Sequence, residues 1–175
     1  MKYPASIRAI HWLSALLIIG LLALGIYMTP FQVDNMAFSE ELYFWHKSFG
    51  VLAFLIVLLR LINRRRHNLP ELPKGMPVHE KLAAKVAHNS LYALLIIVPI
   101  LGYVQSCTYE FSSGVHFFGL LLPELFEDNK SVFEIVNQLH RTASYLLIVL
   151  IFAHVAGALK HRLFDKENDV LNRII

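Results

Sequence analysis

The segment LHRTASYLLIVLIFAHVAGALKH, residues 139–161, is as apolar as a membrane helix and still contains three histidines. They are His140, His154 and His161, which lie 14 and then 7 residues apart. A side chain that can ionise is costly to place in hydrocarbon, so each of these histidines is a candidate functional residue. In a bundle helix with a 3.5-residue repeat, all three lie on one seam together with Leu147. One face of this segment therefore presents imidazoles at more than one depth.

The composition of the chain indicates a membrane protein. Of its 175 residues, 56% are hydrophobic and only 17% are charged. A helix needs about 20 apolar residues to cross the hydrocarbon core, and runs of this length occur four times. They cover residues 9–28, roughly 42–62, 83–104 and 138–159. The sequence therefore predicts an all-α fold, a four-helix transmembrane bundle, with residues 1–175 as a single domain.

The segments that flank and connect the predicted spans are alternately basic and acidic along the chain. The basic ones are at the N-terminus, between the second and third spans and in the C-terminal tail: Lys2, Arg8, Arg64, Arg65, Arg66, Lys74, Lys81, Lys85, Lys160, Arg162, Lys166 and Arg173. The other two connections are acidic, with Asp34, Glu40, Glu41, Glu110, Glu124, Glu127, Asp128 and Glu134. The positive-inside rule then predicts that both termini face the cytoplasm. The basic flanks match anionic lipid, and they give no support for a nucleic-acid partner.

The connection between the third and fourth spans has two notable features. It is expected to hold Cys107, the only cysteine, so the chain has no disulfide. The absence of a C-x-x-C-H run also excludes a covalent c-type haem. The apolar run GVHFFGLLLPELF in the same connection is expected to lie on the outer membrane surface.

Histidines of other spans match those of the fourth span in depth. His154 lies about 21 Å further into the membrane than His140, by helix rise. His46 falls at the outer level with His140, and His11 at the inner level with His154. Two imidazoles that face each other between apolar helices suit the axial positions of a haem iron. The sequence therefore predicts two haems at two depths, with these four histidines as ligands. The flat macrocycle also needs small residues nearby, which Gly20, Gly50 and Gly157 are expected to supply.

Further residues are candidates for secondary roles. His88 lies near the inner level, where it competes with His11 as a ligand or forms a hydrogen bond to a propionate, a quinone or another helix. The neighbours His161 and Lys160 are candidates to bind a quinone at the cytoplasmic side. Alternatively, His161 is an interfacial histidine whose ring reaches the lipid headgroups. Cations beside the predicted ligands are candidates to bind haem propionates: Arg8, Lys47, Arg60 and Arg141. Arg60 has the alternative role of anchoring the end of its span.

Other classes of function use membrane histidines as well. A metal or proton transporter usually recruits carboxylates, and none of the four apolar runs contains Asp or Glu. A structural anchor without a cofactor is a further alternative. The pairing of histidines at two levels favours haem over both.

Four motifs resemble those of a known family: RAIHW, WHKSFGVLAFLIVLLRLINR, AHNSLYALLIIVPILGY and HRTASYLLIVLIFAH, in this order. They are similar to the bacterial cytochrome b561 family, which is related to the cytochrome b subunits of nickel-iron hydrogenases and formate dehydrogenases. The resemblance covers essentially the whole chain. It implies a protein of the bacterial inner membrane with two haem b groups, bound by His11 with His154 and by His46 with His140.

The resemblance also implies a range of electron-transfer partners. One branch of the family oxidises superoxide at the outer face and reduces ubiquinone, and other branches anchor periplasmic dehydrogenases or hydrogenases. Because both axial positions of each iron are filled, the expected chemistry is outer-sphere electron transfer without a catalytic side chain. The expected partners are the bilayer, a quinone, and superoxide or a periplasmic redox protein.

Overall fold

The computed structural model describes residues 2–28 and 36–175, which form four long helices. They are α1 (Ala5–Met28), α2 (Met36–Arg65), α3 (Val78–Thr108) and α4 (Lys130–Phe164). Each is long and apolar enough to cross a bilayer, which confirms the predicted transmembrane bundle. The helices extend beyond the apolar runs because their polar flanks remain helical. Glu40 and Glu41, expected in a connection, lie in α2, and Asp34 lies outside the described residues.

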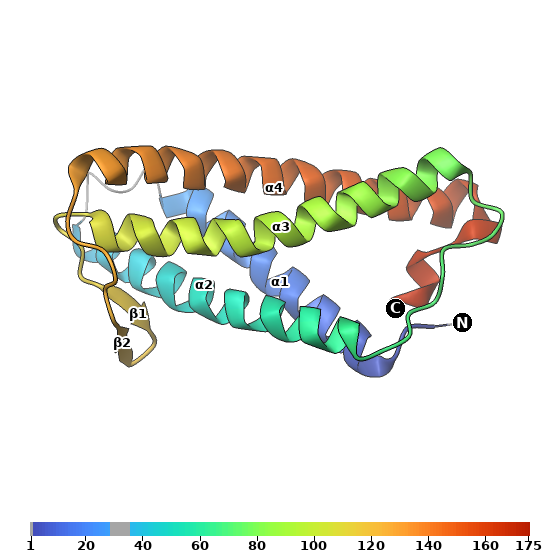
Figure 1. The fold of residues 1–175 in the computed structure, drawn as a ribbon, viewed down its shortest axis with the longest axis horizontal. Coiled ribbons are helices and arrows are strands. Elements are labelled where there is room, and N and C mark those ends of the chain that lie inside the picture. The colour runs from blue at the N-terminus through green and yellow to red at the C-terminus, as the bar shows by residue number, and fades with distance from the viewer. Residues whose placement is uncertain (1, 29–35) are drawn as a thin grey trace.

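The helices pack as two pairs. α1 lies along α2 and α3 along α4, while α2 and α3 make a smaller contact. Both ends of the chain lie at the same end of the bundle (Figure 1), here called the terminal end. The opposite end carries the connection between α3 and α4 and is here called the hairpin end. That the terminal end faces the cytoplasm remains a prediction from charge.

The connection at the hairpin end forms a short antiparallel hairpin of β1 (Val115–Phe117) and β2 (Leu120–Leu122). It packs against α2, where the Ser48 hydroxyl donates to the His116 carbonyl at 3.3 Å and accepts from the Phe118 N–H at 3.0 Å. The expected position of Cys107 in this connection is wrong. α3 continues to Thr108, so Cys107 lies in its last turn and is buried.

The buried core is a thin apolar layer halfway along the bundle. Its centre is formed by Ile18 of α1, Val57 of α2 and Leu147 of α4. Leu147 is 7 residues from both His140 and His154, so this layer separates two levels of histidine. Many other large apolar side chains of the helices are exposed on the outside of the bundle, as the hydrocarbon of a bilayer requires.

The chain after α4 folds back across the terminal end. This C-terminal segment, residues 165–175, contains the short 3-10 helices η1 (Lys166–Asn168) and η2 (Leu171–Arg173). It reaches α1, where the Trp12 indole donates to the Ile174 carbonyl at 3.0 Å and Arg8 donates to the Ile175 carbonyl at 2.6 Å. The segment therefore ties α4 to the first two turns of α1, which include His11.

Candidate functional site

His46 and His140 face each other at the hairpin-end level. Their ring centroids are 6.5 Å apart, and the ring planes are nearly perpendicular at 83°. His140 Nδ1 lies 2.9 Å from the Val98 carbonyl, to which it donates. This bond leaves Nε2 as the free nitrogen, which is how proteins commonly orient a metal-binding histidine. His46 Nδ1 is buried and has no hydrogen-bond partner among the described residues.

Two glycines allow the close approach of these rings. A Cβ atom at Gly102 would lie 3.1 Å from His140 Cε1, and one at Gly25 would lie 3.4 Å from His46 Cε1. Gly102 is one helical turn after Val98, so the same face of α3 supplies both the space and the acceptor for His140. Sequence reasoning missed both glycines. At Gly20, Gly50 and Gly157, predicted to leave room for the macrocycle, a Cβ would meet no atom within 4 Å, and their role stays a prediction.

Three imidazoles meet at the terminal-end level. His11 and His154 have ring centroids 6.4 Å apart, with an interplanar angle of 53°. His88 of α3 lies closer to His154, with centroids 5.2 Å apart. The Arg60 guanidinium donates to His11 Nδ1 at 2.7 Å and to Ser14 Oγ at 3.1 Å. Arg60 also lies over the ring of Tyr92, 5.3 Å from its centroid.

The spacing of the rings tests whether haem iron fits. An iron bound by two imidazole nitrogens at about 2 Å on opposite sides would hold the ring centroids about 6.3 Å apart. The pairs His46–His140 and His11–His154 match this separation. At 5.2 Å, His88 and His154 are too close to hold an iron between them. The centroid separations are therefore compatible with the two predicted pairs, and that of His88 and His154 is not.

The position of the proton on the His11 ring decides whether this histidine can bind iron at the terminal-end level. Because Nδ1 accepts from Arg60, a neutral His11 ring carries its proton on Nε2. Binding iron through Nε2 requires the other tautomer, and Arg60 would then need a different acceptor. A propionate carboxylate is an acceptor of this kind.

The remaining predicted cations differ in what they contact. The Lys47 ammonium donates to the Gly114 carbonyl at 2.8 Å, and Arg8 donates to the C-terminal segment, so both bind the chain itself. Arg141 follows His140, is exposed and has no hydrogen-bond or ion-pair partner among the described residues.

His161 lies between two carboxylates at the terminal end. It is only 7% exposed. Its Nδ1 donates to the Asp165 carboxylate at 3.0 Å, and its Nε2 is 3.4 Å from Glu80 Oε2. Lys160 forms an ion pair with the same Glu80. Each ring nitrogen therefore faces a different carboxylate, hydrogen-bonded to Asp165 and at ion-pair distance from Glu80, so the imidazole can exchange a proton on either side.

Sequence reasoning selected His161 and Lys160 but missed their carboxylate partners. The spacing of His161 and Asp165, i to i+4 at the end of α4, was a usable signal. Glu80 comes from α3, and its contact depends on how α3 and α4 pack. The pKa of the Asp165 carboxyl lies below its ordinary value, mainly because Asn168 donates to it and also because His161 does.

Comparison with known proteins identifies the family of the chain. A family model described as prokaryotic cytochrome b561 matches residues 2–175. Cytochrome b561 homolog 2 of Escherichia coli K12 is 31% identical over 178 aligned positions, covering 99% of this chain and 91% of that protein. Cytochrome b561 homolog 1 of the same organism is 26% identical over 72% of this chain and 70% of that protein. A Yersinia pestis protein named probable superoxide oxidase CybB is 26% identical over 97% of this chain and 94% of that protein.

Proposed function

The chain belongs to the prokaryotic cytochrome b561 family, and from this we propose that it binds two haem b groups. Family membership makes it a membrane electron-transfer protein that binds haem b; the number of haems and their ligands are the proposal. His46 with His140 would hold one haem and His11 with His154 the other. The observation that carries the proposal is the match of both imidazole pairs to the spacing of a doubly ligated iron.

A haem with imidazole on both sides supplies one-electron transfer without an open position for a substrate. The residues around it hold the ligands and exclude water. Val98 and Gly102 orient His140, and the layer of Ile18, Val57 and Leu147 closes the space between the two levels. Arg60 is the cation placed to compensate propionate charge at the inner level, and His88 would act there through a hydrogen bond.

Replacing the ligands tests this assignment. We expect His140→Ala to lose one haem and keep the other, whereas His79→Ala, with a side chain 82% exposed at the terminal end, keeps both. At the inner level we expect His11→Ala to lose a haem and His88→Ala to retain it. The measurement is the ratio of non-covalent haem to protein in the purified variants. Loss of the inner haem in His88→Ala but not in His11→Ala would disprove the pairing.

We further propose that a quinone exchanges electrons at the terminal end, beside His161 and Lys160. Quinone reduction consumes protons as well as electrons, and the contacts of His161 with Asp165 and Glu80 provide a route for the protons. His161 lies about 10 Å beyond His154 along α4, by helix rise. The basic flanks support a cytoplasmic position for this end, with the protein in the inner membrane of a bacterial cell.

Reduction of the haems by a quinol tests this site. In proteoliposomes, we expect His161→Ala to slow the reduction of haem b by ubiquinol about a hundredfold or more at unchanged haem content, which is the usual size of a lost proton-transfer group. The matched control is His67→Ala, because the His67 ring bonds only to the Asn63 carbonyl and contacts neither carboxylate. Unchanged kinetics in His161→Ala would place the quinone elsewhere, while the haem assignment would stand on the separate haem measurement.

Superoxide is a second candidate, as the electron donor at the hairpin end. The similarity to the protein named probable superoxide oxidase CybB favours it, as does the unpaired Arg141 next to His140. An exposed cation attracts an anion, more strongly at low ionic strength. We expect enzymatically generated superoxide to reduce the haems, and Arg141→Gln to react several-fold more slowly than Lys130→Gln at the same end. Haems that stay oxidised would leave a periplasmic redox protein as the donor.

A further inference from the structure

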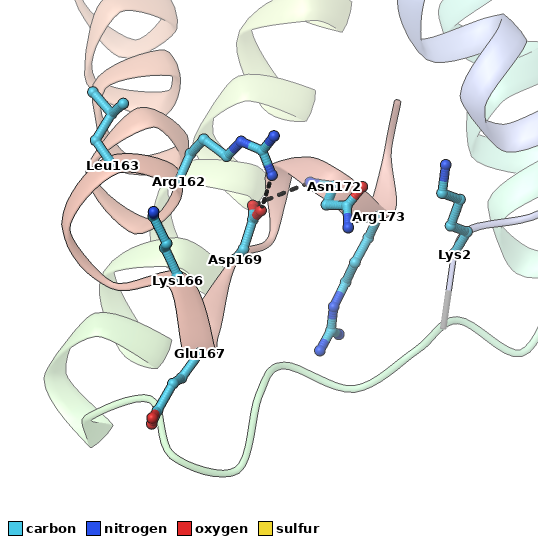
Figure 2. A pocket seen from close by; sticks show the side chains of 8 residues that line it. All are labelled: Lys2, Arg162, Leu163, Lys166, Glu167, Asp169, Asn172 and Arg173. Atoms are coloured by element: carbon cyan, nitrogen blue, oxygen red, sulfur yellow. Dashed lines mark hydrogen bonds and ion pairs between the residues drawn. The ribbon is translucent and has the colours of Figure 1, made fainter.

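A basic cavity lies at the terminal end, outside the histidine sites (Figure 2). Its volume is about 730 Å³. Four cations line it: Lys2 near the N-terminus, Arg162 in the last turn of α4, and Lys166 and Arg173 in the C-terminal segment. The cavity is thus built from both ends of the chain.

The charges in the cavity do not cancel. Asp169 is engaged, because it accepts from Arg162 at 2.7 Å and from the Asn172 N–H at 3.1 Å. The hydrogen bond from Arg162 also keeps the pKa of Asp169 below its ordinary value, so it remains a carboxylate. The other acid, Glu167, points away from Arg162 and Lys166 (Figure 2).

Four cations and two acids line the cavity, so two positive charges are in excess, and three of the cations have no ion-pair partner among the described residues. Lys2 and Lys166 have no hydrogen-bond or ion-pair partner among the described residues. Arg173 donates to the Glu71 backbone carbonyl at 2.6 Å, which fixes the side chain and leaves its charge uncompensated. A cavity with this excess of positive charge favours an anion.

One apolar side chain lines the cavity together with these cations, and a second exposed one follows it in the chain. Leu163 lines the cavity and is 61% exposed, and the next residue, Phe164, is 83% exposed. Both belong to the last turn of α4, a helix long and apolar enough to cross the membrane. The cavity thus lies where a membrane helix ends, at the level of lipid headgroups. A ligand here would meet positive charge on one side and apolar surface on the other.

We propose that this cavity binds the phosphate of an anionic phospholipid headgroup, with the acyl chains lying along Leu163 and Phe164. Basic pockets at the cytoplasmic ends of membrane helices are suited to such headgroups. The same segment bonds to Arg8 and Trp12, so lipid binding would hold it against α1. This site does not depend on the haem or quinone assignments.

Lipid titration of the full-length haem-loaded protein in detergent tests the proposal. Native mass spectrometry would measure binding of phosphatidylglycerol, of phosphatidylcholine with the same acyl chains, and of inorganic phosphate. We expect phosphatidylglycerol to bind in preference to both. The double variant Lys2→Gln/Lys166→Gln should weaken its binding about tenfold or more, because a basic side chain at a membrane surface contributes severalfold in affinity.

The matched control is Lys74→Gln/Lys85→Gln, which removes the same charge from exposed positions outside the cavity. We expect the control to weaken phosphatidylglycerol binding less than about threefold, through screened long-range attraction only. Equal weakening in the two double variants would overturn the proposal, because diffuse surface charge would then explain the binding. Phosphatidylcholine binding as tightly as phosphatidylglycerol, or inorganic phosphate displacing the lipid at equal concentration, would overturn it as well.

Discussion

His140 is oriented by neighbours on two helices. Its Nδ1 donates to Val98 across the α3–α4 contact, and Ser144 Oγ donates to its backbone carbonyl at 2.7 Å. Gly102 leaves room for the ring, with only 3.1 Å between a Cβ at that position and His140 Cε1. The free nitrogen of the ligand is therefore defined by the packing of α3 on α4.

This packing makes Gly102→Ala a sharp test. The added methyl group would displace the His140 ring, weaken its bond to Val98 and reduce the affinity of the hairpin-end haem about tenfold or more, as loss of a bond that orients a metal ligand commonly does. Gly119→Ala in the hairpin turn is the control, because its Cβ would meet no atom within 4 Å and the haem sites do not involve it. Haem dissociation monitored by transfer to apomyoglobin measures the effect. Identical dissociation in the two variants would show that Gly102 has no role in holding His140.

Arg60 is the cation nearest the inner imidazoles, and its charge should raise the potential of the haem at this level. We expect Arg60→Gln to lower that midpoint potential by about 50–100 mV, from the Coulomb energy of a charge at about 7 Å in a partly screened interior. Arg64→Gln is the control, because Arg64 also lies over Tyr92, 5.9 Å from its centroid, but does not contact His11. A potentiometric titration gives both potentials. An equal shift in both variants would assign the effect to general surface charge.

The C-terminal segment is held by carboxylates with lowered pKa values, which makes it sensitive to acid. The main causes are the hydrogen bonds from Asn168 to Asp165 and from Arg162 to Asp169. Because both folded-state pKa values lie below the ordinary value, these groups stabilise the segment fully above that value. The contribution is lost as the pH falls through the lowered folded-state pKa values.

Trp12 reports on this segment through its bond to Ile174. In a Trp45→Phe background, we expect its fluorescence to be constant from neutral pH to about pH 4 and to change only below it. Asp165→Asn/Asp169→Asn should abolish this acid transition and loosen the segment already at neutral pH. A transition near pH 6 that persists in the double variant would instead indicate control by a histidine.

The sequence predicts the helices and the levels of the histidines better than the contacts between helices. Helix periodicity and the 14-residue spacing of His140 and His154 follow from one helix alone, so they could be read directly. The contacts of Gly25, Gly102 and Glu80 depend on how neighbouring helices are rotated against each other, which no single-helix pattern specifies. The hairpin was missed for a related reason, because Ser48 holds it through hydrogen bonds that join distant parts of the chain.

The orientation of the whole bundle follows from its charge asymmetry and can be tested by labelling. Cys107 is only 1% exposed, so the native protein should give little background with a thiol reagent. In spheroplasts, we expect a membrane-impermeant maleimide to label Gly119→Cys at the hairpin end. Lys74→Cys at the terminal end should react only after lysis. The reverse pattern would show that the terminal end faces outward.

The bundle combines two helix pairs, two levels of opposed imidazoles and one apolar layer between them. This arrangement suits a relay that transfers electrons across the bilayer, since each level lies nearer one membrane face. A partner at the hairpin end and a quinone at the terminal end would then exchange electrons without meeting.

The paired-imidazole sites are tested most directly by the haem content of the purified full-length protein. A pyridine haemochrome assay measures the haem, and quantitative amino-acid analysis measures the protein. We predict two non-covalent b-type haems per chain, both low-spin with imidazole on each side, falling to one in His140→Ala. A folded wild-type protein with one haem or none would contradict the paired-imidazole sites.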